Sequence, residues 1–107
     1  MGQNQSFSIS VLLRHEVEGW SAQCLEYDIA AQGKTISEAK YAIEKAFVGQ
    51  VIVDVSTGNP PLADIPPAPP AYWQEFERGE RLAGRKSFFI PQPFMFRAAV
   101  EEMRIAA

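Results

Sequence analysis

The 107-residue chain contains one cysteine, Cys24, and one histidine, His15. A single cysteine excludes an intrachain disulfide and any metal site built from several cysteines. No apolar run approaches the roughly 20 residues that a membrane-spanning helix needs. Residues 1–6 also lack the basic and apolar stretches of a signal peptide. We therefore expect a cytoplasmic protein that holds its fold without covalent cross-links.

Basic residues are scarce relative to acidic ones: 10 Lys and Arg stand against 13 Asp and Glu, a formal net charge of −3. This balance argues against direct nucleic-acid binding, which normally uses a basic patch, and it suits a basic partner instead. The acidic surplus lies in residues 1–58. A chain this short also gains from burying surface in an oligomer, so we expect a dimer or a higher homo-oligomer.

Proline is absent before residue 60, and the sequence there has regular periodicities. Apolar and polar residues alternate over 7–13 and again over 20–24, which predicts two strands of a hairpin that turns near Val17 and Glu18. Residues 29–32 predict a short third strand that Gly33 ends.

A helix is predicted after this third strand. Thr35 and Glu38 have the spacing of a capping box, in which Thr35 accepts from the Glu38 amide and Glu38 reaches back to the Thr35 amide. Helical spacing of apolar residues continues from Ala39 to Val51. The β-branched stretch 51–55 leaves open whether the last turns are helical or extended, and we favour a helix to about residue 55.

All 8 prolines lie in the second half, which predicts a different organisation. Residues 59–70 are typical of a semi-rigid extended connector. Residues 71–82 predict a helix, residues 87–90 a strand, and residues 94–107 a terminal helix. We therefore divide the chain into a domain of residues 1–58 and a proline-rich connector with an aromatic C-terminal arm, residues 59–107.

Residue types used in catalysis are present but badly spaced. The predicted hairpin places His15 opposite Trp20 and Cys24 opposite Val11, so strand geometry separates the two side chains by roughly 13 Å, too far for a nucleophile and its base. Gly33-Lys34-Thr35 matches only the end of a phosphate-binding loop, because the loop's first glycine is replaced by Asp28. We expect no catalytic residue, no metal and no cofactor.

The charged clusters are better explained as solvated surface than as catalytic or nucleic-acid-binding sites. Four carboxylates near the hairpin could be acid–base pairs, but a solvated hairpin edge accounts for them better: Glu16, Glu18, Glu26 and Asp28. A basic cluster beyond the connector is interleaved with glutamates, which is typical of a solvated helix face: Arg78, Arg81, Arg85 and Lys86.

Aromatic residues are concentrated beyond the connector, where the chain has little capacity for a core of its own. Two interpretations remain open: these side chains dock onto the exposed face of the first domain's sheet, or they pack against a partner or a second subunit. The candidate interface residues are Tyr72, Trp73, Phe76, Phe88, Phe89, Phe94 and Phe96.

The first half resembles the HicB-like antitoxin family. The resemblance covers residues 7 to about 50 and rests on the strand 7–13, the run Glu18-Gly19-Trp20-Ser21-Ala22, the run 28–33, and the helix start Thr35-Ile36-Ser37-Glu38-Ala39. It implies an α+β fold of β-β-β-α type, a three-stranded antiparallel sheet plus a helix related to a reduced ribonuclease-H-like sheet. It also implies a non-catalytic protein that binds and neutralises HicA, a small basic toxin that cleaves mRNA.

The sequence departs from this family in two places. Residues 25–30 replace the family's common Pro-Glu-Leu-Pro-Gly-Cys turn, and the second half contains no recognisable DNA-binding module. The first departure leaves the expected fold intact, whereas the second argues against autoregulation. The expected function is thus a HicB-like antitoxin, and the alternative is an orphan HicB-like oligomer, structural or regulatory, without a toxin.

Overall fold

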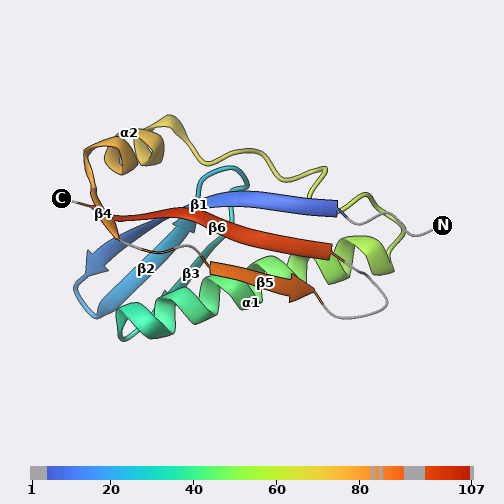
Figure 1. The fold of residues 1–107 in the computed structure, drawn as a ribbon, viewed down its shortest axis with the longest axis horizontal. Helices are drawn as coiled ribbons and strands as arrows, with labels where there is room; N and C mark the ends of the chain where they lie inside the picture. Colours follow the sequence, from blue (N-terminus) through green and yellow to red (C-terminus); the bar gives the residue numbers. More distant parts are fainter. Residues whose placement is uncertain (1–4, 83, 85, 91–95, 107) are drawn as a thin grey trace.

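The computed structural model describes residues 5–82, 84, 86–90 and 96–106, with backbone only for residues 5 and 87–90. One mixed β-sheet has a long helix on one face and a short helix with its connector on the other (Figure 1). The elements follow in the order β1 (Gln5–Glu16), β2 (Gly19–Cys24), β3 (Ala30–Gly33), α1 (Ile36–Ser56), α2 (Pro70–Arg78), β4 (Glu80–Leu82), β5 (Lys86–Ile90) and β6 (Phe96–Ile105).

The predicted α+β class agrees with this fold, but the predicted three-stranded antiparallel sheet is wrong. The strand order is β3-β2-β1-β6-β4, and β5 also pairs with β6. Strand β6 lies parallel to β1 along most of its length, from the pair Gln5–Phe96 to the pair Leu13–Ile105. Parallel neighbours need a long crossover connection, and here the connection consists of everything between β1 and β6. The second half of the chain therefore completes the sheet of the first half.

The predicted terminal helix over residues 94–107 is also wrong, because β6 occupies residues 96–105. Its composition of Ala, Glu, Met and Arg favours a helix by intrinsic propensity. A bulge opposite Ile9 and Ser10 also shifts the register, so Val100 and Met103 are both buried three residues apart, at a spacing typical of helices. Pairing with β1 outweighs this local preference.

The hairpin and the first helix were predicted correctly. His15 pairs with Trp20 and Val11 with Cys24, the register expected from the turn position. Thr35 caps α1, since its Oγ1 accepts from the Glu38 amide at 3.1 Å. The Glu38 carboxylate returns to the amide of Lys34 at 3.2 Å rather than to that of Thr35.

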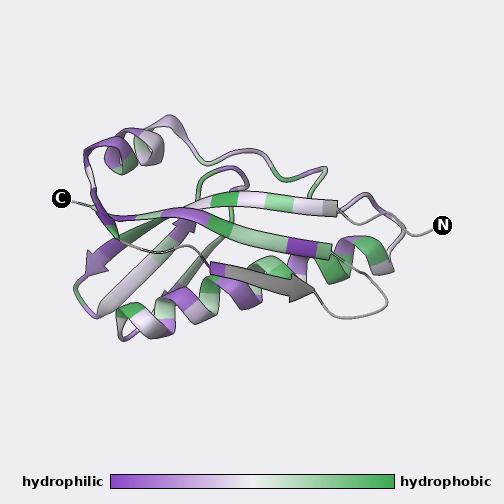
Figure 2. Ribbon diagram, in the orientation of Figure 1, coloured by the Kyte–Doolittle hydropathy of each residue, from purple (hydrophilic) through white to green (hydrophobic). Residues whose placement is uncertain are grey.

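Helix α1 runs to Ser56, which settles the question that residues 51–55 left open in favour of a helix. It covers one face of the sheet and contributes Ala39, Ile43, Phe47 and Val51 to the main core. Polar and apolar stretches alternate along it in Figure 2. Gly33 allows the close approach of β3 to this helix, because an added Cβ would lie 2.4 Å from the Ala39 nitrogen. The larger of the two core clusters therefore lies between α1 and the sheet.

The opposite face is covered by the connector and α2. The amide of Ala68 donates to the Leu25 carbonyl at 2.9 Å, and the amide of Asp28 donates to the Pro66 carbonyl at 2.7 Å. A second, smaller core cluster forms below them from Leu12, Leu25, Ala68 and Phe76. The proline-rich segment is thus hydrogen-bonded to the loop between β2 and β3.

Helix α2 is shorter than the helix predicted over residues 71–82. It ends at Arg78, since Gly79 has an extended backbone and β4 begins at the next residue. Arg104 of β6 holds this end in place: its Nη1 donates to the carbonyls of Phe76 and Glu77, both at 3.1 Å. A basic side chain on the last carbonyls of a helix is a favourable C-terminal interaction.

Candidate functional site

Cys24 and His15 do not form a catalytic pair. Cys24 is fully buried in β2, and burial raises the pKa of its thiol to about 12, so the reactive thiolate is not formed at neutral pH. His15 lies four strand positions away at the hairpin end, where its ring packs against that of Trp20 in a tilted arrangement with 4.8 Å between the ring centres. The surroundings of both residues are those of side chains that support the fold.

Two of the four hairpin carboxylates serve the fold. Glu26 accepts from the amide of Ser10 at 2.7 Å and from its hydroxyl at 2.9 Å. Asp28 accepts from the side-chain amide of the buried Gln23 at 2.9 Å. These contacts clamp the loop between β2 and β3. Within the part of the chain that the structure describes, no three His, Cys, Asp or Glu side chains are grouped so as to hold a metal ion.

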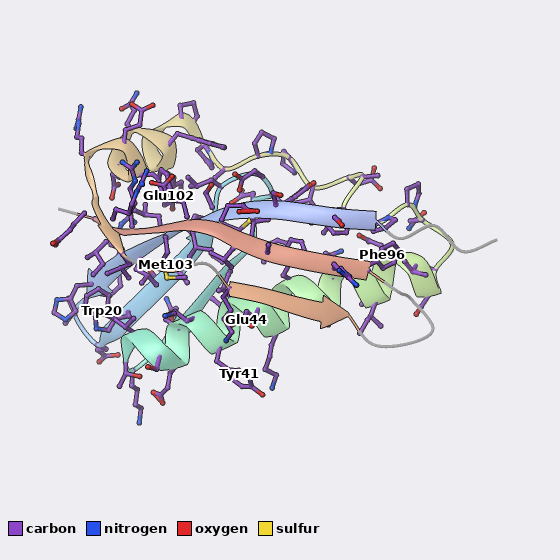
Figure 3. All side chains as sticks on the ribbon, in the orientation of Figure 1. Trp20, Tyr41, Glu44, Phe96, Glu102 and Met103 are labelled. Carbon is purple, nitrogen blue, oxygen red and sulfur yellow. The ribbon has the colours of Figure 1, made fainter. Side chains whose placement is uncertain are left out.

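The other two carboxylates, Glu16 and Glu18, are exposed at the end of the hairpin. Between them Val17 is fully exposed, at 103% of its reference area. Trp20 follows on β2, half-buried, and Figure 3 shows it at the hairpin end of the sheet, remote from Phe96. We call Glu16, Val17, Glu18 and Trp20 the hairpin-end surface.

The hairpin-end surface is concave. A shallow hollow of about 470 Å³ is lined by its residues together with Gly19, Gln32 and Gly33. Gly19 is required here for two reasons: its φ is +143°, and a Cβ would lie 2.5 Å from the carbonyl oxygen of Gly33. The backbone at Gly19 can therefore lie close to β3, so the hairpin end and this edge strand form one surface.

A second hollow of about 200 Å³ lies on the sheet face that α2 partly covers. It shares Glu16 and Gln32 with the first hollow and is lined further by Leu12, Arg14, Ser21, Ala22, Gln23, Ala30 and Tyr72. The two hollows therefore adjoin at Glu16 and Gln32.

An ion pair of Arg14 lies beside the second hollow. Arg14 of β1 forms a two-point ion pair with Glu75 of α2, and its guanidinium lies 4.9 Å from the centre of the Tyr72 ring. The hydrogen bond to Glu75 raises the pKa of Arg14 above its ordinary value, so the guanidinium stays charged at any physiological pH. Helix α2 is thus joined to the sheet beside the second hollow by this ion pair as well as by the packing of Phe76.

The structure places the predicted interface aromatics in different surroundings. Phe76 and Phe96 are buried, Phe76 in the small cluster under α2 and Phe96 in the main core against Phe7. Tyr72 and Trp73 are half-buried, and the indole nitrogen of Trp73 donates to the Ala68 carbonyl at 3.1 Å.

The structure describes the remaining three predicted aromatics only in part or not at all. Phe88 and Phe89 lie on β5, but their side chains are outside the described part of the structure, as is Phe94 altogether. Phe76 thus lies against the sheet face under α2, Phe96 lies in the core under α1, and Tyr72 and Trp73 keep part of their surface exposed. Contact of these residues with a partner stays a prediction.

Sequence reasoning missed the hairpin-end surface because it treated residues 15–19 as a polar connection. The available signal was Val17, an apolar residue in a turn flanked by glutamates, followed by a Gly–Trp pair. Tyr41, 62% exposed on the outer side of α1 (Figure 3), was also missed. In the described residues, no helix has the length and apolar character to cross a membrane.

Comparison with known protein families, with curated proteins and with solved structures found no match to this chain.

Proposed function

We propose that this chain is a non-catalytic protein-binding module of the HicB-like antitoxin type, which covers a small basic partner and acts in the cytoplasm. The partner class follows from the resemblance of the first half to HicB-like proteins, whose toxins are small, basic and cleave mRNA. The net charge of −3 is compatible with such a partner.

The hairpin-end surface is the observation that carries the proposal. It combines a fully exposed valine, two exposed carboxylates and a half-buried tryptophan around a hollow of about 470 Å³. Interface hot spots are enriched in tryptophan and are surrounded by contacts that exclude water, and the rim of an interface is polar. Carboxylates around an apolar centre select and steer a basic partner.

The edge of the sheet next to this surface adds a second means of binding. Strand β3 pairs with β2 and with no other strand of the described sheet, so its outer backbone groups face away from the sheet. A partner strand that aligned there would gain main-chain hydrogen bonds, while the hairpin-end surface would supply specificity. The two features adjoin through Gln32 and Gly33.

The test is binding to a HicA-like protein encoded by a neighbouring reading frame. The double variant Glu16→Lys with Glu18→Lys should weaken the complex at least tenfold by isothermal titration calorimetry, and it should restore RNA cleavage by the toxin. The matched control is Glu77→Lys with Glu80→Lys, which makes the same charge change at two exposed positions that do not line the hollow. If the unmodified chain forms no complex and leaves RNA cleavage intact, the antitoxin proposal is wrong.

Self-assembly without a toxin is the second candidate function, and strand β5 favours it. This strand pairs with β6 and lacks a second neighbour among the described strands, although its sequence Lys-Ser-Phe-Phe-Ile is apolar for an edge. Apolar edge strands tend to pair with another chain. Light scattering over a range of concentrations should show a dimer or larger species, and a monomeric mass throughout would exclude this candidate.

A further inference from the structure

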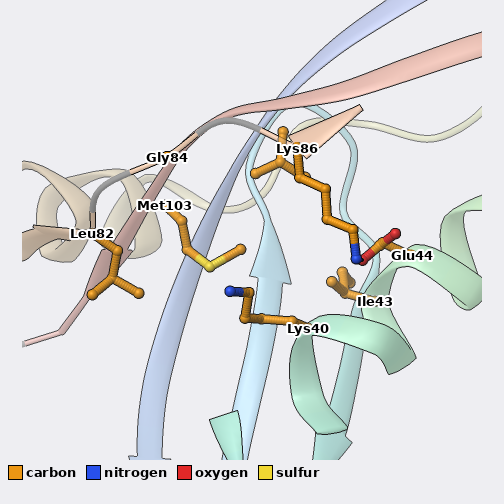
Figure 4. Close-up of a pocket in the computed structure, with 8 residues that line it drawn as sticks. Lys40, Ile43, Glu44, Leu82, Gly84, Lys86 and Met103 are labelled. Atoms are coloured by element: carbon orange, nitrogen blue, oxygen red, sulfur yellow. The ribbon is translucent and has the colours of Figure 1, made fainter. Parts of the chain in front are cut away.

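A separate hollow of about 180 Å³ lies between α1 and the β4–β5 edge of the sheet, on the face opposite α2 (Figure 4). Its apolar lining comes from three elements, since α1 contributes Ile43, β4 contributes Leu82, and β6 contributes Val100 and Met103. Three charged side chains complete it: Lys40, Glu44 and Lys86. None of these residues belongs to the hairpin-end surface.

The charges of this hollow are unbalanced. Lys86 Nζ lies 2.8 Å from Glu44 Oε2, so these two side chains neutralise each other. Lys40 forms neither a hydrogen bond nor an ion pair with any residue that the structure describes. In Figure 4 its side chain extends toward Met103. Among the described residues that line it, the hollow therefore carries one uncompensated positive charge, in a protein of net charge −3.

We propose that this hollow binds a small carboxylate whose apolar group is about the size of a benzene ring. The apolar group would pack against Ile43, Val100 and Met103, and the carboxylate would pair with the ammonium of Lys40. The volume fits such a ligand, because an apolar cavity of about 150 Å³ is known to hold benzene. An apolar pocket with one well-placed polar group is the general form of a small-molecule site.

The charge arrangement also determines selectivity between ligands. A neutral ligand of the same size would gain the apolar contacts but would leave Lys40 without a partner. A cationic ligand would be repelled by Lys40 and would have to compete with Lys86 for Glu44. The site should thus prefer an anion, with an affinity on the order of 1 mM for a ligand of so few atoms.

Methyl NMR on the full chain tests the proposal, with benzoate as the probe and benzyl alcohol as its neutral counterpart. The chain has 3 methionines, so selective methyl labelling yields few signals, and Met103→Leu identifies that of Met103. Benzoate should shift the Met103 methyl signal saturably, and benzyl alcohol should bind at least fivefold more weakly. The Lys40→Met variant should lose this preference, whereas Lys40→Arg should retain it.

Lys45→Met is the matched control. It removes one lysine from the same helix, but Lys45 lies outside the hollow, with its ammonium 5.3 Å from the centre of the Tyr41 ring. This variant should bind benzoate within twofold of the unmodified chain. The proposal is overturned if benzoate gives no saturable shift of Met103, or if Lys40→Met binds benzoate as tightly as Lys45→Met does.

Discussion

The two faces of the sheet are built in different ways. The face under α1 carries one continuous core, in which residues of β1, β2, β6 and the helix interdigitate. The face under α2 carries a small cluster, supplemented by an ion pair, by Arg104 on the helix end and by backbone bonds to the connector. The first face carries the larger core, and the second leaves the hollow of about 200 Å³ open beside α2.

Truncating one large side chain on each face gives the largest expected difference. Phe47→Ala should destabilise the chain by about 3–5 kcal/mol, because Phe47 is fully buried at the centre of the main core. Phe76→Ala should cost less, since Phe76 belongs to the small cluster and retains 7% exposure. Urea denaturation measures both values. Equal losses would mean that the second face contributes as much to stability as the first.

Two glycines on the α1 side test how closely the helix approaches the sheet. Gly33→Ala should destabilise by about 1–3 kcal/mol, because its Cβ would collide with the backbone at Ala39. Gly49→Ala, within α1, should instead stabilise by about 0.5–1 kcal/mol, since nothing lies within 4 Å of the added carbon and alanine favours a helix. Thermal melts of the two variants should therefore shift in opposite directions. A neutral Gly33→Ala would show that helix and strand can separate at little cost.

The buried thiol of Cys24 makes the α1 face sensitive to alkali. Burial raises its pKa from 9.0 to about 12 in the folded chain, so the unfolded chain releases this proton first as the pH rises. The contribution is complete below about pH 9 and is lost as the pH approaches 12. It falls by at most about 1.4 kcal/mol per pH unit within this window. Denaturation midpoints from pH 8 to 11 should fall more steeply for the unmodified chain than for Cys24→Ala, and parallel curves would contradict this.

The ion pair between Arg14 and Glu75 should give the smallest effect. Both side chains are about one-third exposed, at 33% and 38%, so solvent screens their attraction. A double-mutant cycle with Arg14→Met and Glu75→Gln should give a coupling energy of about 0.2–1 kcal/mol that decreases with added salt. Arg78→Met, on the exposed side of the same helix, serves as the control. A coupling well above this range would show that the α2 face depends on charge as the α1 face depends on packing.

The part of the fold that could be predicted is the part with local signals. Alternation over residues 7–13 and 20–24 indicated the hairpin and its register, and the Thr35–Glu38 pair indicated the start of α1. The end of α2 was harder to predict, because only the pairing of β4 with β6 converts residues 80–82 from helix to strand. The hairpin-end surface was missed, although Val17 and Trp20 were visible in the sequence.

The sequence by itself determined the hairpin, the short third strand and the capped helix, because each depends on neighbours within a few residues along the chain. Only the tertiary structure decided that residues 96–105 form a strand. Their composition favours a helix, and they become β6 only by pairing with β1 some 90 residues earlier. The same long-range pairing buries Phe96 in the main core and places Met103 in the same hollow as Lys40. Helix α2 likewise contacts β1 only in the folded chain. No local signal in the sequence states which distant segments will contact each other, so the surfaces that such contacts create appear only in the folded chain.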